Sequence, residues 1–137
     1  MYTIQELSSM LHVPASTLRY YEEIGLLLNV NRNTKNQRIY DDSHIRKIHG
    51  INCFKRTGMS ISKILEFYKY ADNLDTNIDD ILLLVKEQEA DIQEKIKIME
   101  MDLVHIREKV TYYSAIKKAI DEDAPWPRWS DVVSAKQ

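Results

Sequence analysis

The sequence predicts a mainly α-helical protein in which a head of short helices and one small β-hairpin precedes a single long coiled-coil helix. Three observations lead to this prediction. The 137 residues include only three glycines and three prolines, and they are rich in leucine, isoleucine, lysine and glutamate, which favours helices. The first 60 residues contain four candidate helix starts and one polar, Asn-rich loop. The second half carries an apolar residue about every 3.5 positions.

The first two predicted helices are short and are separated by a tight turn. Thr3 and Glu6 have the spacing of a capping box, and apolar residues follow with helical periodicity. Pro14 ends the first helix, because proline lacks an amide proton and restricts the residue before it. The second helix starts at about Pro14 and ends at Gly25. Two short helices joined in this way are typical of a helix-turn-helix unit.

Residues 26–40 are predicted to form a β-hairpin. A polar loop rich in asparagine lies between two runs of residues that are compatible with strands, 26–28 and 38–40. A hairpin that follows a helix-turn-helix is called a wing.

Two further helices complete the predicted head. Asp41 caps a third helix that ends at Gly58, and Ser60 caps a fourth. We therefore expect residues 1–71 to form a winged helix-turn-helix domain.

A polar linker at residues 72–76 is predicted to lead into a dimerisation helix at 77–120. Steps of four and three residues from Ile78 to Ile120 reach thirteen positions, of which eleven are apolar. This repeat is typical of a coiled-coil seam, and 43 residues span roughly 64 Å. No other segment is long enough to cover the seam, so we expect a homodimer, with packing on the chain's own head as the alternative. The residues predicted to mediate dimerisation are Leu82, Val85, Ile92, Ile96, Met99, Leu103, Ile106 and Val110.

The C-terminal tail, residues 121–137, contains Pro125 and Pro127, which are expected to end the long helix. Trp126 and Trp129 are large and apolar, so we expect both to dock on a surface that the sequence does not identify.

The composition restricts the protein's location and partners. The longest apolar run, residues 81–85, is far shorter than the roughly 20 residues of a membrane span, so no membrane association is expected. The N-terminus lacks the pattern of a secretion signal, and the single Cys53 excludes an internal disulfide, which predicts a cytoplasmic protein. Residues 1–60 carry a net charge of +3 and residues 61–137 a net charge of −5. This asymmetry suggests a head that faces nucleic acid.

The second helix and the hairpin carry side chains suited to duplex DNA. The Arg19 guanidinium can pair with two guanine acceptors or with a phosphate, and the Tyr20 hydroxyl can donate to a phosphate. The predicted DNA-binding residues are Ser16, Thr17, Arg19 and Tyr20 in the helix and Arg32, Lys35, Asn36 and Arg38 in the hairpin. Any one of them alone is more simply interpreted as a solvated surface residue. Their order within helix, turn, helix and hairpin is what favours DNA binding.

Three sequence motifs resemble a known family. Residues 18–27 read LRYYEEIGLL, residues 38–40 read RIY, and residues 58–61 read GMSI. Over residues 2–70 they strongly resemble the mercury-resistance regulator (MerR) family of bacterial transcription factors.

The resemblance implies a mechanism as well as a fold. It implies an antiparallel coiled-coil dimer in which each head binds half of a pseudo-palindromic promoter site and RNA polymerase is a partner. It also implies that the protein bends and untwists DNA between promoter elements, which costs several kcal/mol. By the same resemblance, Arg19 and Tyr20 contact DNA from the helix and Arg38 from the wing, whereas Tyr21 and Tyr40 are structural.

The sequence is compatible with several kinds of effector that such a regulator could sense. The 17 residues after Ile120 are too few for a folded ligand-binding domain. Metal sensing is disfavoured because no cysteine follows Cys53 and only His49 shares a helix with it at suitable spacing, so we expect no metal site and no cofactor. An apolar ligand between the coiled coil and the head, near Tyr112, Tyr113 or the tail, is a further alternative.

Cys53 itself has two interpretations. It can be a small buried hydrophobic residue, or a reactive thiolate with Lys55 and Arg56 as cationic neighbours. The resemblance extends to a subgroup of the family that responds to aldehydes or other electrophiles, which implies modification of Cys53 as the signal.

Two other classes of protein fit the sequence less well. Three isolated glycines exclude a Gly-rich phosphate loop, and the common zinc-protease and hydrolase motifs are missing. We therefore expect that the protein is not an enzyme. A coiled-coil adaptor without a role at DNA would explain residues 76–120. It would leave the hairpin and Arg19 without a function.

Overall fold

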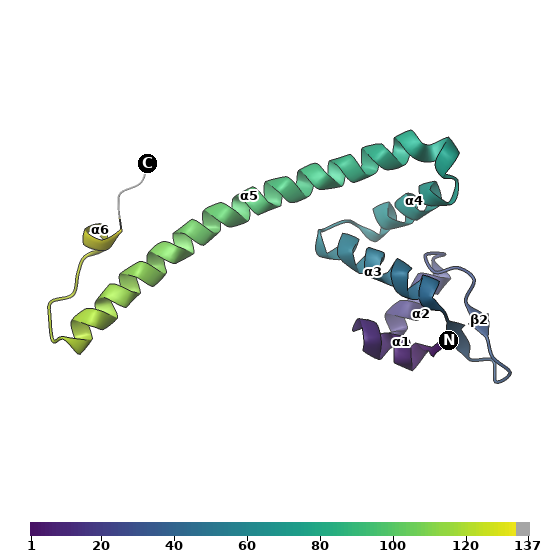
Figure 1. Cartoon of the computed structure of the whole chain (residues 1–137), viewed down its shortest axis with the longest axis horizontal. Helices are drawn as coiled ribbons and strands as arrows, with labels where there is room; N and C mark the ends of the chain where they lie inside the picture. The colour runs from purple at the N-terminus through teal and green to yellow at the C-terminus, as the bar shows by residue number, and fades with distance from the viewer. Residues whose placement is uncertain (134–137) are drawn as a thin grey trace. The chain divides into compact units, whose positions relative to one another are not determined.

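The computed structural model describes residues 1–133, so the last part of the predicted tail, 134–137, lies outside the described residues. The chain forms two compact units that divide between Gln88 and Glu89. Figure 1 shows that helices dominate both, which confirms the predicted mainly α-helical class. None of the helices in the described part of the chain is long and apolar enough to cross a membrane.

The first unit begins with the predicted pair of short helices, α1 (Ile4–Leu11) and α2 (Ala15–Glu23). The capping box is present: the Glu6 amide donates to Thr3 Oγ1 at 3.1 Å, and the Thr3 amide donates to Glu6 Oε1 at 3.0 Å. α2 follows directly after Pro14 and ends two residues before Gly25, which adopts a positive φ of 80°. Both helix boundaries therefore follow from local sequence chemistry.

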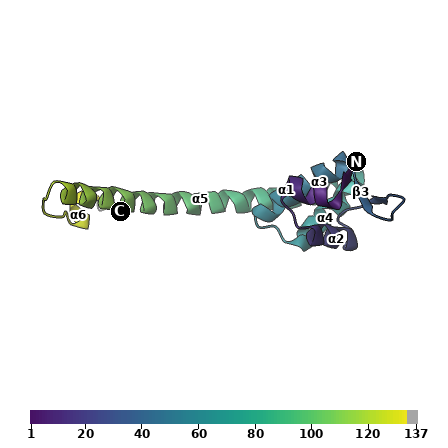
Figure 2. The same cartoon turned by 90° about the horizontal axis from the view of Figure 1, so that it is seen from below.

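The wing is part of a three-stranded antiparallel sheet with the order β1-β3-β2. The strands are β1 (Tyr2–Thr3), β2 (Asn31–Arg32) and β3 (Arg38–Tyr40). In Figures 1 and 2 the loop between β2 and β3 projects away from the helices of the first unit. The wing prediction is thus confirmed in its position, and β1 adds a strand that the sequence did not indicate.

The first arm of the hairpin was wrongly expected at residues 26–28. Leu26 and Leu27 are completely buried, and their amides donate to the Tyr21 carbonyl at 2.8 and 3.0 Å. They close the end of α2 and fill the core, because two adjacent leucines gain more from burial there than from a place in an exposed hairpin. The strand itself starts at Asn31, which pairs with Ile39.

α3 (Asp42–Arg56) and α4 (Ile61–Asp72) complete the head. Their predicted caps are confirmed, since Asp41 accepts from the Ser43 amide and Ser60 accepts from the Lys63 amide. The helices are connected by aromatic packing, with the Phe54 and Phe67 ring centroids 4.8 Å apart.

Gly50 allows α3 and α4 to approach closely. A Cβ atom at this position would lie 2.6 Å from the Tyr68 hydroxyl. That hydroxyl donates to the Lys47 carbonyl at 3.3 Å, and the Lys47 ammonium lies over the Tyr68 ring.

α5 (Leu74–Asp121) is one uninterrupted helix of 48 residues, as the apolar repeat predicts. Its start differs from the prediction, because Asn73 alone separates it from α4 and most of the expected linker at 72–76 is helical. Thr76 lies in the first turn of α5, where its amide donates to the Asp75 carboxylate at 3.0 Å.

The first turns of α5 belong to the first unit. Leu84 is buried in the core, and Val85 packs partly against it. The Gln88 amide group donates to the Thr57 carbonyl at 3.1 Å and to Thr57 Oγ1 at 2.9 Å. For this stretch the alternative of packing on the chain's own head holds, and Val85 lies against that head rather than in an exposed seam.

The second unit comprises the rest of α5, a turn and the short helix α6 (Trp129–Val132). Trp129 docks on α5 as expected, with its ring centroid 5.1 Å from that of Tyr112. The Tyr112 hydroxyl donates to the Pro127 carbonyl at 3.3 Å. Trp126 stays 65% exposed, so the expected docking of this residue is not found within residues 1–133.

Candidate nucleic-acid interface

α2 presents one apolar face to the core and one polar face to solvent. Leu18 and Tyr21 are buried, and the Lys55 ammonium donates to the Tyr21 hydroxyl at 3.1 Å. The side chains on the opposite face are the ones predicted to contact DNA: Ser16, Arg19 and Tyr20 are exposed, and Thr17 is half-buried. Helical periodicity alone therefore places the four predicted residues of α2 toward solvent.

The wing is held in shape by its own asparagines. Asn33 Oδ1 accepts from the amides of Lys35 and Gln37 at 3.0 and 2.9 Å. Asn36 adopts a left-handed conformation with φ 60°, and its carbonyl accepts from Arg32 Nη1 at 3.0 Å. Asparagine tolerates this conformation and mimics backbone turns with its side chain, which explains the Asn-rich composition of the loop.

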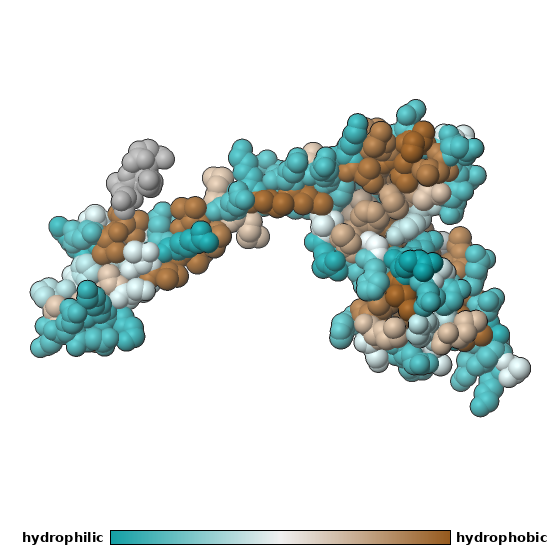
Figure 3. Space-filling model, viewed as in Figure 1, coloured by the Kyte–Doolittle hydropathy of each residue, from teal (hydrophilic) through white to brown (hydrophobic). Residues whose placement is uncertain are grey.

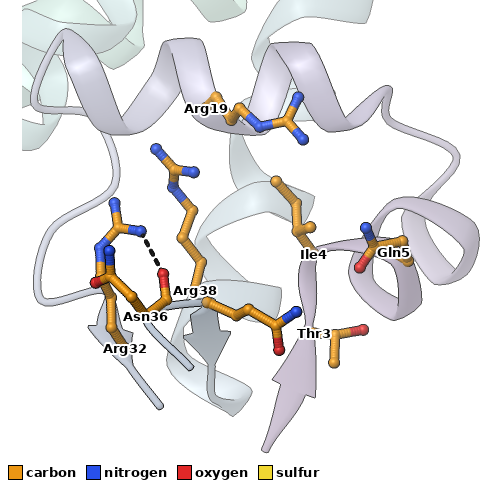
Figure 4. Close-up of a pocket in the computed structure, with 8 residues that line it drawn as sticks. Thr3, Ile4, Gln5, Arg19, Arg32, Asn36 and Arg38 are labelled. Atoms are coloured by element: carbon orange, nitrogen blue, oxygen red, sulfur yellow. Dashed lines mark hydrogen bonds between the residues drawn. The ribbon is translucent and has the colours of Figure 1, made fainter. Parts of the chain in front are cut away.

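A polar pocket of about 290 Å³ lies between α2, the wing and the start of α1. Figure 4 shows the three arginines that line it, Arg19 from α2 and Arg32 and Arg38 from the strands of the wing. Its other lining residues are Thr3, Ile4, Gln5, Asn36 and Gln37. Half of the predicted DNA-binding residues thus meet in one pocket, and the others, Ser16, Thr17, Tyr20 and Lys35, do not line it.

Glu22 is a residue of this region that the sequence analysis missed. Arg38 Nε donates to Glu22 Oε2 at 2.6 Å, and Arg32 Nη2 lies 3.9 Å from Glu22 Oε1. This hydrogen bond raises the pKa of Arg38, which stays charged. Glu22 therefore connects α2 to both strands of the wing.

Tyr40 lies beneath the same charges. It is completely buried, and its hydroxyl has no hydrogen-bond partner among residues 1–133. Burial, and after it the Glu22 carboxylate, raises the pKa of Tyr40. The burial of Tyr21 and Tyr40 agrees with the structural role that the resemblance implies for both.

Cys53 is exposed on α3, so its interpretation as a buried hydrophobic residue is wrong. Lys55, one of its expected cationic neighbours, is engaged instead with the hydroxyl of Tyr21. Burial, and after it a negative charge on Cys53, raises the pKa of Tyr68 in the aromatic cluster of α3 and α4. Among the described residues, no group of three or more acidic, cysteine or histidine side chains is placed to hold a metal ion.

The part of α5 in the second unit carries a row of exposed apolar side chains. Ile96, Met99, Leu103 and Ile106 line a shallow groove of about 360 Å³ on the helix surface. Figure 3 shows apolar side chains along α5, and no segment within residues 1–133 buries those of the groove. Of the remaining predicted seam residues, Leu82 and Val110 are exposed and Ile92 is half-buried.

The head has the architecture of a winged helix-turn-helix protein, in which a helix with one polar face lies next to a basic hairpin. Residues 2–70, just over half of the chain, match the sequence profile of the family described as MerR HTH family regulatory protein. The chain therefore belongs to the MerR family of helix-turn-helix regulatory proteins, as the motifs in its sequence indicated. It is a transcriptional regulator.

Relatives extend the similarity beyond the head. The chain is 28% identical over 116 residues to an uncharacterised HTH-type transcriptional regulator of Haemophilus influenzae, which covers 85% of this chain and 86% of the relative. It is 36% identical over 64 residues to the regulator AdhR of Bacillus subtilis, covering 47% and 46% of the two chains. A crystal structure of HiNmlR, a MerR family regulator lacking the sensor domain, bound to promoter DNA, is similar with a TM-score of 0.78, 27% identity, and coverage of 90% and 91%.

Proposed function

We propose that this protein binds a pseudo-palindromic promoter site as a homodimer and controls transcription by distorting the DNA between promoter elements. The observation that carries the proposal is the shared basic face of α2 and the wing, on which three arginines line one pocket. The similar HiNmlR chain is bound to promoter DNA, and this supports the proposal. A promoter-binding regulator works where bacterial DNA lies, so we place it in the cytoplasm and assign it no enzymatic activity.

The exposed face of α2 is proposed to enter the major groove. Arg19 has no hydrogen bond or ion pair within residues 1–133, so its guanidinium is available for a base edge or a phosphate. Ser16, Thr17 and Tyr20 accompany it on the helix. Arg32, Lys35, Asn36 and Arg38 of the wing are proposed to contact the flanking backbone, where cations release counterions from DNA.

Salt-dependent binding distinguishes this function from that of a coiled-coil adaptor. Binding of a promoter duplex should weaken steeply as salt rises, because several phosphate contacts are formed. Arg19→Ala should weaken specific binding by about 1–3 kcal/mol if the side chain contacts a base. Lys86→Ala, which removes an exposed cation from α5, serves as the control and should leave the affinity unchanged. Weak binding without salt dependence would support the adaptor instead.

The second copy is proposed to pair with α5 through the exposed seam in an antiparallel arrangement. An antiparallel seam packs one heptad position against the other, so a pair centred between Met99 and Leu103, in the middle of the groove, places Ile96 opposite Ile106 of the other copy. The double variant Ile96→Glu/Ile106→Lys then brings opposite charges together in each such pair, whereas a parallel pair brings like charges together. A double variant that dimerises better than either single variant supports the antiparallel arrangement, and one that dimerises worse excludes it.

The effect on the promoter can be followed directly. DNA distortion at the centre of the site should appear in a footprint as altered cleavage between the two half-sites, at positions that the heads do not cover. Transcription by RNA polymerase from the same promoter, with and without the protein, then gives the direction of regulation. A footprint without any altered central cleavage would contradict the distortion mechanism.

Cys53 is the proposed site of the signal. An aldehyde can add to an exposed thiol to form a hemithioacetal: sulfur bonds to the carbonyl carbon, and the carbonyl oxygen takes up the proton that the thiol loses. Exposure of Cys53 makes this addition possible, and no other cysteine competes with it. Intact mass after formaldehyde or methylglyoxal should show an adduct on the native protein that Cys53→Ala lacks. A normal transcriptional response in Cys53→Ala would rule out this signal.

A further inference from the structure

The pocket between α2 and the wing holds more positive than negative charge. Three guanidinium groups line it, and its eight lining residues include no carboxylate. Glu22 contacts two of the arginines, and Glu23 adds a more distant negative charge on the same helix. The pocket is therefore suited to an additional anion.

Glu22 uses only part of the Arg38 side chain. A guanidinium carries five N–H donors, and the hydrogen bond of Arg38 to Glu22 is made by Nε at 2.6 Å. Within residues 1–133, the two terminal nitrogens of Arg38 donate to no acceptor. Arg38 and Glu22 are both about three-quarters buried, so their contact is shielded from solvent. Arg38 is thus held at one side and retains donors on the other.

Arg19 and Arg38 approach the pocket from different elements. Arg19 projects from α2 and Arg38 from β3, as Figure 4 shows. Arg32 is less available, because one of its terminal nitrogens is bonded to the Asn36 carbonyl. The polar side chains of Thr3 and Gln5 complete the same pocket. Forked donors on two sides and neutral polar groups on a third are the chemistry that binds a tetrahedral phosphate group.

We propose that one backbone phosphate of the bound duplex enters this pocket between Arg19 and Arg38, and that Glu22 is a positioning residue that holds the Arg38 guanidinium for it. The inference rests on the proposed DNA-binding function. Without Glu22, Arg38 is a flexible side chain that must be ordered at the moment of binding, which weakens the contact. The carboxylate itself repels the phosphate. Its ion pair with Arg38 offsets that repulsion.

If Glu22 competed with DNA instead of positioning Arg38, its removal would change the DNA affinity in the opposite direction. If the carboxylate competed with DNA for the arginines, its removal would free Arg32 and Arg38 and strengthen binding. If it positions Arg38, its removal weakens binding at one phosphate. The two roles are therefore separated by measurement at single phosphates.

The experiment uses the full chain and a duplex that contains the footprinted site. Each backbone phosphate in one half-site is replaced in turn by a neutral methylphosphonate. For the native protein we expect one position at which the replacement weakens binding roughly tenfold, the lower range for hydrogen bonds to a charged group. Arg38→Ala should lose most of this loss of affinity at that position, and the remaining contact of the phosphate with Arg19 accounts for the rest.

Variants of Glu22 then test the positioning role. Glu22→Ala should weaken binding of the unmodified duplex by about 3- to 10-fold. It should also lose most of the penalty at the same phosphate, that is, the loss of affinity caused by the methylphosphonate. Glu22→Gln keeps an oxygen that can accept from Arg38 Nε, so it should retain part of the penalty. Glu23→Ala is the matched control: it removes a carboxylate from the next position of α2, and should keep the whole penalty.

The possible failures are distinguishable. A full penalty at that phosphate in both Glu22 variants, or tighter binding by Glu22→Ala, would overturn the positioning role. Circular dichroism of each variant shows whether it is folded. If Glu22→Ala does not fold, the result for Glu22→Gln tests the positioning role. A native protein that binds the duplex without salt dependence would instead refute the proposed function itself.

Discussion

Dimerisation through the α5 seam makes a prediction that two methionines on one helix can test. Met99 lies on the apolar repeat and is 68% exposed, whereas Met101 lies off the repeat and is 65% exposed. Each is replaced by alanine. The two substitutions are matched in residue type, exposure and intrinsic helix propensity, so they differ in the helix face that they change.

The expected magnitude follows from these exposures. Complete burial of a methionine side chain contributes about 1.5–3 kcal/mol. With 68% of Met99 still available for burial, Met99→Ala should cost about 1–2 kcal/mol per chain and thus about 2–4 kcal/mol per dimer. That corresponds to a dissociation constant raised roughly 30- to 700-fold. Met101→Ala removes a similar exposed area from the opposite face, and it should change the constant by less than about threefold.

Sedimentation equilibrium over a range of protein concentrations measures both dissociation constants. Circular dichroism checks that α5 remains helical in each variant. Equal effects of the two substitutions would mean that the apolar repeat is not the interface. A larger effect of Met101→Ala would place the second copy on the other face of α5.

Three further predictions concern the stability of the head, each measured by urea unfolding. Gly50→Ala should lower the free energy of unfolding by about 1 kcal/mol, because the new Cβ would lie 2.6 Å from the Tyr68 hydroxyl. In a Tyr68→Phe background, Gly50→Ala should instead leave the free energy of unfolding unchanged or raise it by up to about 1 kcal/mol through helix propensity. Equal effects in both backgrounds would contradict the clash. Tyr40→Phe should raise the free energy of unfolding by about 1 kcal/mol, since it removes a buried hydroxyl that has no partner within residues 1–133, and a clear loss of stability would show that the hydroxyl is satisfied. Gln88→Ala should cost about 1–2 kcal/mol by breaking its two hydrogen bonds to the end of α3, whereas Gln93→Ala, at an exposed position of α5, should cost nothing, and equal effects would argue against those bonds.

The elements that the sequence predicted well are those controlled by neighbouring residues. The caps at Thr3, Asp41 and Ser60 depend on side chains within three positions of each other. The length of α5 follows from a periodic pattern that no proline or glycine interrupts. These signals are local, so one sequence is sufficient to find them.

The elements that it missed depend on partners far along the chain. β1 has two residues, and it exists because Tyr2 pairs with Tyr40. The leucines at 26 and 27 have the apolar character of a strand, but the core behind α2 is where they fit. No local pattern separates a buried turn from a short buried strand.

The same distinction applies to the candidate site. The arginines could be selected from residue type and from their place in a helix or hairpin. Glu22 could not, because its partner Arg38 is 16 residues away and an isolated carboxylate in the sequence resembles a solvated charge. Cys53 was ambiguous for a related reason: Ile51 is buried and Cys53 two residues later is exposed, and this orientation of α3 is set by packing against other elements.

The attachment of the first turns of α5 to the head determines where this protein can be cut and rejoined. The connection at Asn73 looks like the natural border of the head, but Leu84 and Gln88, which lie beyond it, contribute to the core and to the end of α3. A hybrid regulator that combines this head with a foreign coiled coil should therefore be joined after Gln88, with the heptad register of the two helices kept in phase. A junction at Asn73 would leave the head without a buried leucine and without the two hydrogen bonds at Thr57.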